Sequence, residues 1–169
     1  RGLELFEGKA MCSACHLSVA SEQSTGYAAG KALFTDHTYD NLGIPANPAV
    51  WALTGSDAVD LGLGGFLATQ PMFADMAADE NGKFKVPTLR NVAKNPPYGH
   101  NGYFRTLYDI VHFYNTRDVP EAGWAPPEYP ATMNTDELGA LGLTYEEELA
   151  VVAFMKTLTD RAIMPQPAH

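Results

Sequence analysis

The sequence has little basic charge and no long apolar run. Among its 169 residues, 11 are Lys or Arg and 20 are Asp or Glu, which gives a formal net charge of −9. This balance excludes the broad basic surface that binds nucleic-acid phosphates or an anionic bilayer. No stretch approaches the roughly 18 uninterrupted apolar residues of a membrane-spanning helix, so we expect no such helix. The chain opens on Arg1 without the apolar core of a signal peptide, so we expect a processed mature chain or a fragment.

Cysteine is also scarce, whereas glycine and proline are abundant. The chain has two Cys residues, against 15 Gly and 12 Pro. Its length and its 46% apolar content are ordinary for one globular domain with a real core. We therefore expect residues 1–169 to form a single domain, with long loops where glycine and proline cluster.

Both cysteines fall in one short motif, Cys12-Ser13-Ala14-Cys15-His16. This C-x-x-C-H pattern is the attachment signature of c-type haem. Two thiols three positions apart on a helical turn can each bond to one edge of a porphyrin, while the adjacent imidazole binds the iron. The sequence therefore predicts one covalently attached haem.

Three other interpretations of the cysteine pair fit less well. A thioredoxin-like redox pair needs a βαβ context, whereas the segment before Cys12 has Leu3, Phe6 and Ala10 at helical spacing. A zinc site needs four ligands, and the sequence has no second C-x-x-C or H-x₃₋₅-H motif. A disulfide suits an exported protein but leaves His16 unexplained.

Three segments are expected to be helical. The first runs from Gly2 to about His16; the second begins at Thr106, a candidate N-cap with Asp109 three residues later; the third begins at Thr144, where Glu147 completes a capping box. The remainder is predicted to be loop. The fold class is therefore all-α: a c-type cytochrome domain whose long Gly/Pro-rich loops wrap around one covalent haem.

Several ordered motifs together resemble a known family. In chain order they are GLELFEGKAMCSACH at 2–16, ALFTD at 32–36, NLGIP at 41–45, FKVPTLRNV at 84–92 and PYGHNG at 97–102. This series resembles the second haem domain of the bacterial di-haem cytochrome c peroxidase and MauG family. Members usually carry an upstream domain with another C-x-x-C-H, whereas this sequence has only one such motif.

The resemblance implies an electron-transferring haem domain of a multi-haem protein or complex in the bacterial periplasm. Its partner would be a redox protein or another haem domain, and an oligomer or larger complex is compatible with it. The alternative is a haem peroxidase or MauG-like oxidase that reacts with hydrogen peroxide at this haem.

The resemblance also implies the iron ligands. His16 would be the proximal ligand. The distal ligand follows fourteen residues after His100, at Tyr114, where the peroxidases place Met and MauG places Tyr. Helical periodicity also places Tyr114 on the apolar face of its segment and turns His112 away, toward solvent. The alternatives are Met72 and Met76, in an apolar loop segment, and His100, as a distal or relay residue.

Two further expectations concern the surroundings of the haem. Arg90 lies in an apolar stretch, where a guanidinium could pair with a haem propionate. Asn95 and Pro97 fall where the family uses backbone carbonyls to bind calcium between its two haem domains. Calcium takes six to eight oxygens, so these two residues would supply only part of a site.

Overall fold

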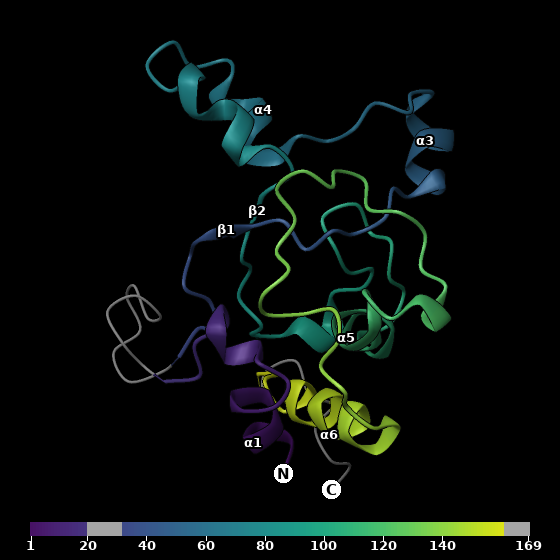
Figure 1. Cartoon of the computed structure of the whole chain (residues 1–169). Coiled ribbons are helices and arrows are strands. Elements are labelled where there is room, and N and C mark those ends of the chain that lie inside the picture. The colour runs from purple at the N-terminus through teal and green to yellow at the C-terminus, as the bar shows by residue number, and fades with distance from the viewer. Residues whose placement is uncertain (20–31, 161–169) are drawn as a thin grey trace, which may run out of the picture.

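The computed structural model describes residues 1–19 and 32–160, in which short helices are joined by long loops (Figure 1). The α-helices are α1 (Gly2–Glu7), α3 (Pro48–Thr54), α4 (Gly62–Leu67), α5 (Leu107–Thr116) and α6 (Tyr145–Lys156). The 3₁₀ helices are η1 (Cys12–Ala14), η2 (Ala74–Glu80), η3 (Val92–Lys94) and η4 (Pro120–Ala122). The strands β1 (Tyr39–Asp40) and β2 (Phe84–Lys85) pair antiparallel. The mostly helical class predicted from the sequence is confirmed.

The two longest helices begin where their caps predict. Thr106 accepts a hydrogen bond from the backbone N–H of Asp109, whose carboxylate accepts one from the Thr106 N–H in return. Thr144 and Glu147 form the same reciprocal pair at the start of α6. Each box satisfies two donors that a helix N-terminus otherwise leaves unpaired.

The first helix is shorter than expected. We predicted a helix from Gly2 to about His16, but α1 ends at Glu7. Glycine is a weak helix former, and Gly8 leaves helical geometry. Met11 then takes a left-handed conformation with φ 52°, and a separate 3₁₀ turn carries Cys12. The cysteine motif is thus on a helical turn, as expected, but not on α1.

Helix α3 lies in a region predicted to be loop. Its start does carry local signals: the Asn47 side chain accepts a hydrogen bond from the N–H of Ala49, and Pro48 occupies the first turn. It ends at Gly55, in a left-handed conformation with φ 68°. These end signals could have identified the helix, although none of its residues is buried.

The core lies between α1, α5 and α6. Helix α6 packs against α1, α5 and η3. The rings of Phe6, Phe34 and Phe154 meet edge to face, with centroids 5.1 to 6.1 Å apart. A Cβ at Gly2 would collide with the backbone oxygen of Ala150, so glycine is what lets α1 approach α6 this closely.

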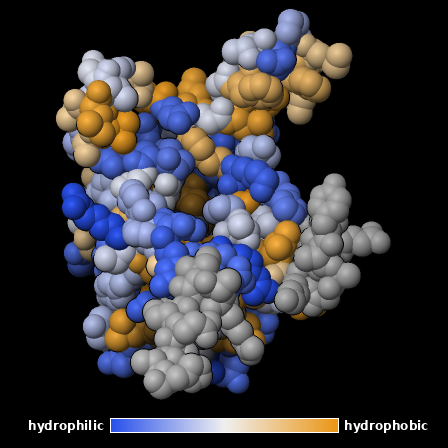
Figure 2. Space-filling model, turned by 180° about the vertical axis from the view of Figure 1, so that it is seen from behind, coloured by the Kyte–Doolittle hydropathy of each residue, from blue (hydrophilic) through white to orange (hydrophobic). Residues whose placement is uncertain are grey.

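Helix α4 and η2 form an arm that projects from the rest of the chain (Figure 1). Figure 2 shows hydrophobic side chains gathered on this arm. Its large exposed apolar residues are Phe66, Met72, Phe73 and Met76. Within the described residues, no helix is both long and apolar enough to cross a membrane.

Candidate functional site

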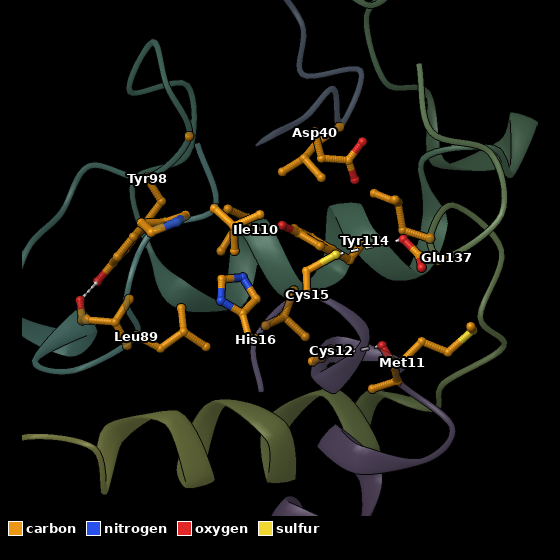
Figure 3. A pocket seen from close by; sticks show the side chains of 18 of the residues that line it. Met11, Cys12, Cys15, His16, Asp40, Leu89, Tyr98, Ile110, Tyr114 and Glu137 are labelled. Carbon is orange, nitrogen blue, oxygen red and sulfur yellow. Dashed lines mark hydrogen bonds between the residues drawn. The ribbon is translucent and has the colours of Figure 1, made fainter. Parts of the chain in front are cut away.

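A cavity of about 450 Å³ lies where η1, α5 and the segment that follows β2 converge (Figure 3). Its walls are mainly apolar, and core residues from α1, α5 and α6 contribute to them. The apolar residues include Phe6, Ala10, Leu42, Ile44, Val86, Leu89, Leu107, Ile110, Val111, Leu138, Leu141, Leu143 and Met155. The hydrophobic core therefore surrounds a cavity large enough for a cofactor and is not close-packed throughout.

Cys12 and Cys15 both line this cavity and are not joined in a disulfide. Burial raises the pKa of the Cys12 thiol to about 12. Burial also raises the pKa of Cys15 to about 12, and the carboxylates of Glu137, Asp40 and Asp36 add to that effect. Redox-active thiol pairs require a lowered pKa, so these surroundings argue against a thioredoxin-like pair.

His16 lines the cavity and is oriented through one ring nitrogen. Its Nδ1 lies 2.8 Å from the carbonyl oxygen of Phe34. Because a carbonyl can only accept, Nδ1 carries the proton and donates, which leaves Nε2 unprotonated. Burial lowers the pKa of the imidazole and so favours this neutral form. Metal-bound histidines are commonly oriented by a hydrogen bond of this kind.

Arg90 lies outside the lining of the cavity. Its Nε donates to the carbonyl of Ala32 at 2.9 Å, and its guanidinium lies over the Phe34 ring, 5.1 Å from the centroid. Arg90 thus fixes the segment whose carbonyl orients His16, and its pairing with a haem propionate stays a prediction.

Tyr114 points from α5 into the same cavity as His16 (Figure 3). Burial, with the nearby Cys12, Cys15 and Asp40, raises the pKa of its hydroxyl far above the ordinary value. His112 faces away from the cavity, as expected. However, its side chain is only 37% exposed, and its Nδ1 is 2.8 Å from the carboxylate of Glu148. His112 thus faces solvent in part, as expected, and also contacts a buried carboxylate on α6, which the sequence did not indicate.

Of the three alternative distal ligands, His100 lines the cavity, whereas Met72 and Met76 do not. His100 lines the cavity, where its ring stacks on Phe84 at 3.8 Å and its Nε2 lies 3.0 Å from Glu128. Met72 and Met76 lie on the projecting arm, 85% and 55% exposed, and do not line the cavity. The structure thus gives no support to either methionine as a ligand.

The expected calcium residues lie outside the cavity. Asn95 and Pro97 are both exposed, and the Asn95 side chain donates to the carbonyl of Asn91 at 3.3 Å. Neither residue lines the cavity that contains the candidate haem ligands.

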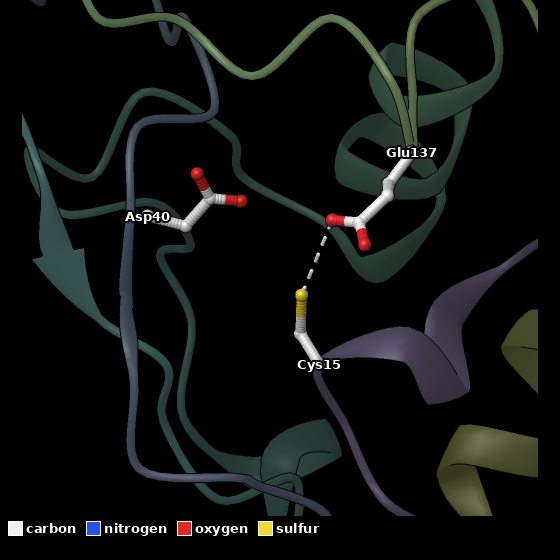
Figure 4. Close-up of side chains that lie close together, drawn as sticks. All are labelled: Cys15, Asp40 and Glu137. Carbon is white, nitrogen blue, oxygen red and sulfur yellow. Dashed lines mark hydrogen bonds between the residues drawn. The ribbon is translucent and has the colours of Figure 1, made fainter.

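Sequence analysis missed two carboxylates in the cavity, Asp40 and Glu137. One potential ligand atom from each of Asp40, Glu137 and Cys15 lies within 4.8 Å of the other two (Figure 4). Asp40 belongs to β1, whereas Glu137 lies in the loop before α6. Such a meeting of distant segments leaves no local signal in the sequence.

The residues present fit a haem c. The cavity offers apolar walls for a porphyrin, two thiols for covalent attachment and an imidazole oriented through Nδ1. Together with the helical fold, these features define a c-type cytochrome domain.

Comparisons with known proteins agree with this class. No family model matches the chain. It is 36% identical to the methylamine utilization protein MauG of Paracoccus denitrificans, over 91% of this chain and 40% of that protein. It is 31% identical to the cytochrome-c peroxidase IdrP1 of Denitromonas iodatirespirans, over 94% of this chain and 39% of that protein. Its structure resembles the diheme peroxidase BthA of Burkholderia thailandensis, with TM-score 0.76 and 30% identity over 98% of this chain and 44% of that one.

The chain therefore belongs to the family of MauG and the di-haem cytochrome c peroxidases. It spans about 40% of the length of the curated relatives it matches. The resemblance inferred from the ordered motifs is confirmed, and so is the assignment of the chain as a haem domain of such proteins.

Proposed function

We propose that this chain carries a single haem c and passes electrons to or from another redox centre, as one domain of a longer protein or complex. The observation that carries the proposal is the apolar cavity in which Cys12, Cys15, His16 and Tyr114 meet. A bound haem would supply an iron centre that gains and loses one electron. The surrounding residues set where that centre sits and how stable each of its two charge states is.

In this proposal each member of the attachment motif has a distinct role. The thiols of Cys12 and Cys15 form the covalent links, and His16 is the proximal ligand through Nε2. The carbonyl of Phe34 holds the proton on Nδ1 and fixes the plane of the ring. The apolar walls of the cavity would keep water away from a bound porphyrin.

We further propose that Tyr114 is the distal ligand. Its side chain enters the cavity from α5, whereas Met72 and Met76 are exposed on the arm. Burial opposes loss of the phenol proton, so the iron charge would have to stabilise the phenolate. A tyrosinate stabilises the oxidised state and fills the position that peroxide would need. This favours electron transfer over a peroxidase or MauG-like oxidase activity at this haem.

The cellular setting belongs to the same proposal. A haem c domain of this family would work in the bacterial periplasm, with a redox protein or another haem domain as its partner. The acidic balance of the chain, to which two propionates would add, suits a partner with a basic or apolar docking face. Asn95 and Pro97 remain proposed contributors to a calcium site completed by other residues of a longer protein.

The test is the change Tyr114→Phe in the haem-loaded protein. We expect the ferric absorption spectrum to change and iron-phenolate bands to disappear from the resonance Raman spectrum. Tyr98→Phe is the matched control, because Tyr98 also lines the cavity but donates its hydroxyl to the carbonyl of Val92 at 3.0 Å. A wild-type haem without iron-phenolate bands, or one that reacts rapidly with peroxide, contradicts the assignment.

A further inference from the structure

Two carboxylates stand at the edge of the cavity where Cys15 lies. The Sγ of Cys15 is 3.7 Å from Oε2 of Glu137, and a carboxylate oxygen of Asp40 lies within 4.8 Å of both groups. Figure 4 shows the two acidic side chains reaching toward the same sulfur from different segments. These are the only Asp and Glu side chains among the described residues that line the mainly apolar cavity.

One amide fixes both carboxylates. The Nδ2 of Asn134 donates to Oδ2 of Asp40 at 2.7 Å and to Oε2 of Glu137 at 2.8 Å. Asp40 also accepts the backbone N–H of Asn41 at 2.8 Å. The amide neutralises no charge, so it holds two acidic groups in place without cancelling their field.

No cation within the described residues pairs with either group. The ion pairs of this part of the chain involve other acidic residues. Lys85 lines the cavity, but its Nζ is 3.3 Å from both Nδ1 of His37 and the carbonyl oxygen of Val86. The negative charge beside Cys15 is therefore not cancelled by an ion pair, although Lys85 lines the same cavity.

Haem attachment would bring that charge against the ring. A sulfur in a thioether has no proton to donate, so Glu137 loses the Cys15 donor and keeps the Asn134 donor. Ferric haem carries one more positive charge than ferrous haem. Fixed negative charge in a poorly polarisable cavity stabilises the more positive state.

We propose that the negative charges of Asp40 and Glu137 lower the reduction potential of the haem held at Cys15. Asn134 positions both carboxylates through its hydrogen bonds. The inference rests on the proposed function, because it requires a haem in this cavity. It adds a role for two residues outside the attachment motif. Their effect is electrostatic, so removing the charge while keeping the shape should reveal it.

The experiment compares Asp40→Asn, Glu137→Gln and the double variant in the haem-loaded protein. Each replacement keeps an oxygen that can accept from Asn134. At a fixed solution potential we expect each single change to raise the ferrous-to-ferric ratio, and the double change to raise it by about tenfold. A tenfold change corresponds to about 59 mV for a one-electron couple.

The control is Asp136→Asn, which removes the same charge from an exposed residue of the same loop that does not line the cavity. We expect it to shift the ratio by less than either single change. A ratio unchanged in both single variants, or shifted equally by the control, overturns the proposal. So does an altered ferric spectrum, because the shift would then come from new iron ligands.

Intact mass on the same samples separates this inference from the function on which it rests. A wild-type chain without haem contradicts both. A wild-type chain with haem and an unshifted potential in the variants contradicts only the role of Asp40 and Glu137. The two single variants are independent, so one that does not fold leaves the other to decide the result.

Discussion

His16 and Phe34 meet through one hydrogen bond, 2.8 Å from the imidazole Nδ1 to the carbonyl oxygen. Phe34 adopts a left-handed conformation with φ 56°, which is unfavourable for an aromatic residue. Such strain persists where the surrounding structure holds it in place. Here the Arg90 guanidinium covers the Phe34 ring, and the edge contacts with Phe6 and Phe154 secure it from the core.

Removing the Arg90 side chain should therefore weaken the fold. Arg90→Ala loses the contact with the Phe34 ring and the hydrogen bond to Ala32, which together contribute about 1 to 2 kcal/mol. Denaturant unfolding of the protein without haem measures the change, with Arg105→Ala as the control, because Arg105 is exposed. If Arg90 instead binds a propionate, its replacement will shift the haem potential and leave the stability of the haem-free chain unaltered.

A second prediction concerns Glu148, a carboxylate that is only 2% exposed. Its Oε1 accepts from His112 at 2.8 Å and from Asn115 at 2.6 Å, which ties α6 to α5. Glu148→Ala removes the acceptor of the buried Asn115 amide and of the partly exposed His112 ring, so we expect a loss of about 3 kcal/mol in the free energy of unfolding. Glu148→Gln keeps one acceptor oxygen and should cost less. Chemical denaturation of both variants checks the order, and equal losses would contradict a role for the acceptor.

Tyr108 should make the fold sensitive to high pH. Burial and the hydrogen bond to Glu148 raise the pKa of Tyr108 to about 12, whereas an unfolded tyrosine titrates near 10. A raised pKa contributes stability that is present below about pH 10 and is lost as the pH rises through about 12. Unfolding measured between pH 9 and 12 should therefore show a steeper loss in wild type than in Tyr108→Phe. An equal loss of stability with pH in the two proteins would contradict the role of Tyr108.

The capped helices were predictable because their signals are local. Thr106 with Asp109, and Thr144 with Glu147, each sit within one turn, and the hydrophobic spacing that follows identifies the buried face. The attachment motif is equally local, so Cys12, Cys15 and His16 could be assigned to one site without a structure. Tyr114 followed from its helix face and from the family resemblance.

The remaining features depend on contacts between distant segments. Glu137 approaches Cys15 from 122 residues away, and no spacing rule predicts that meeting. The contacts of Arg90 with the Phe34 ring and the Ala32 carbonyl likewise join segments far apart in the sequence, so its apolar neighbours could not indicate them. His112 was assigned to solvent because it is opposite the haem face, whereas that side of α5 contacts Glu148 on α6.

The most direct test of the account is the intact mass of the purified protein, measured beside its absorption spectrum after denaturation. We predict a mass equal to the chain plus one haem, and a c-type haem spectrum that survives unfolding because both links are covalent. In Cys12→Ser with Cys15→Ser the haem should be lost on unfolding. A colourless wild-type protein with the mass of the polypeptide alone would contradict the central claim.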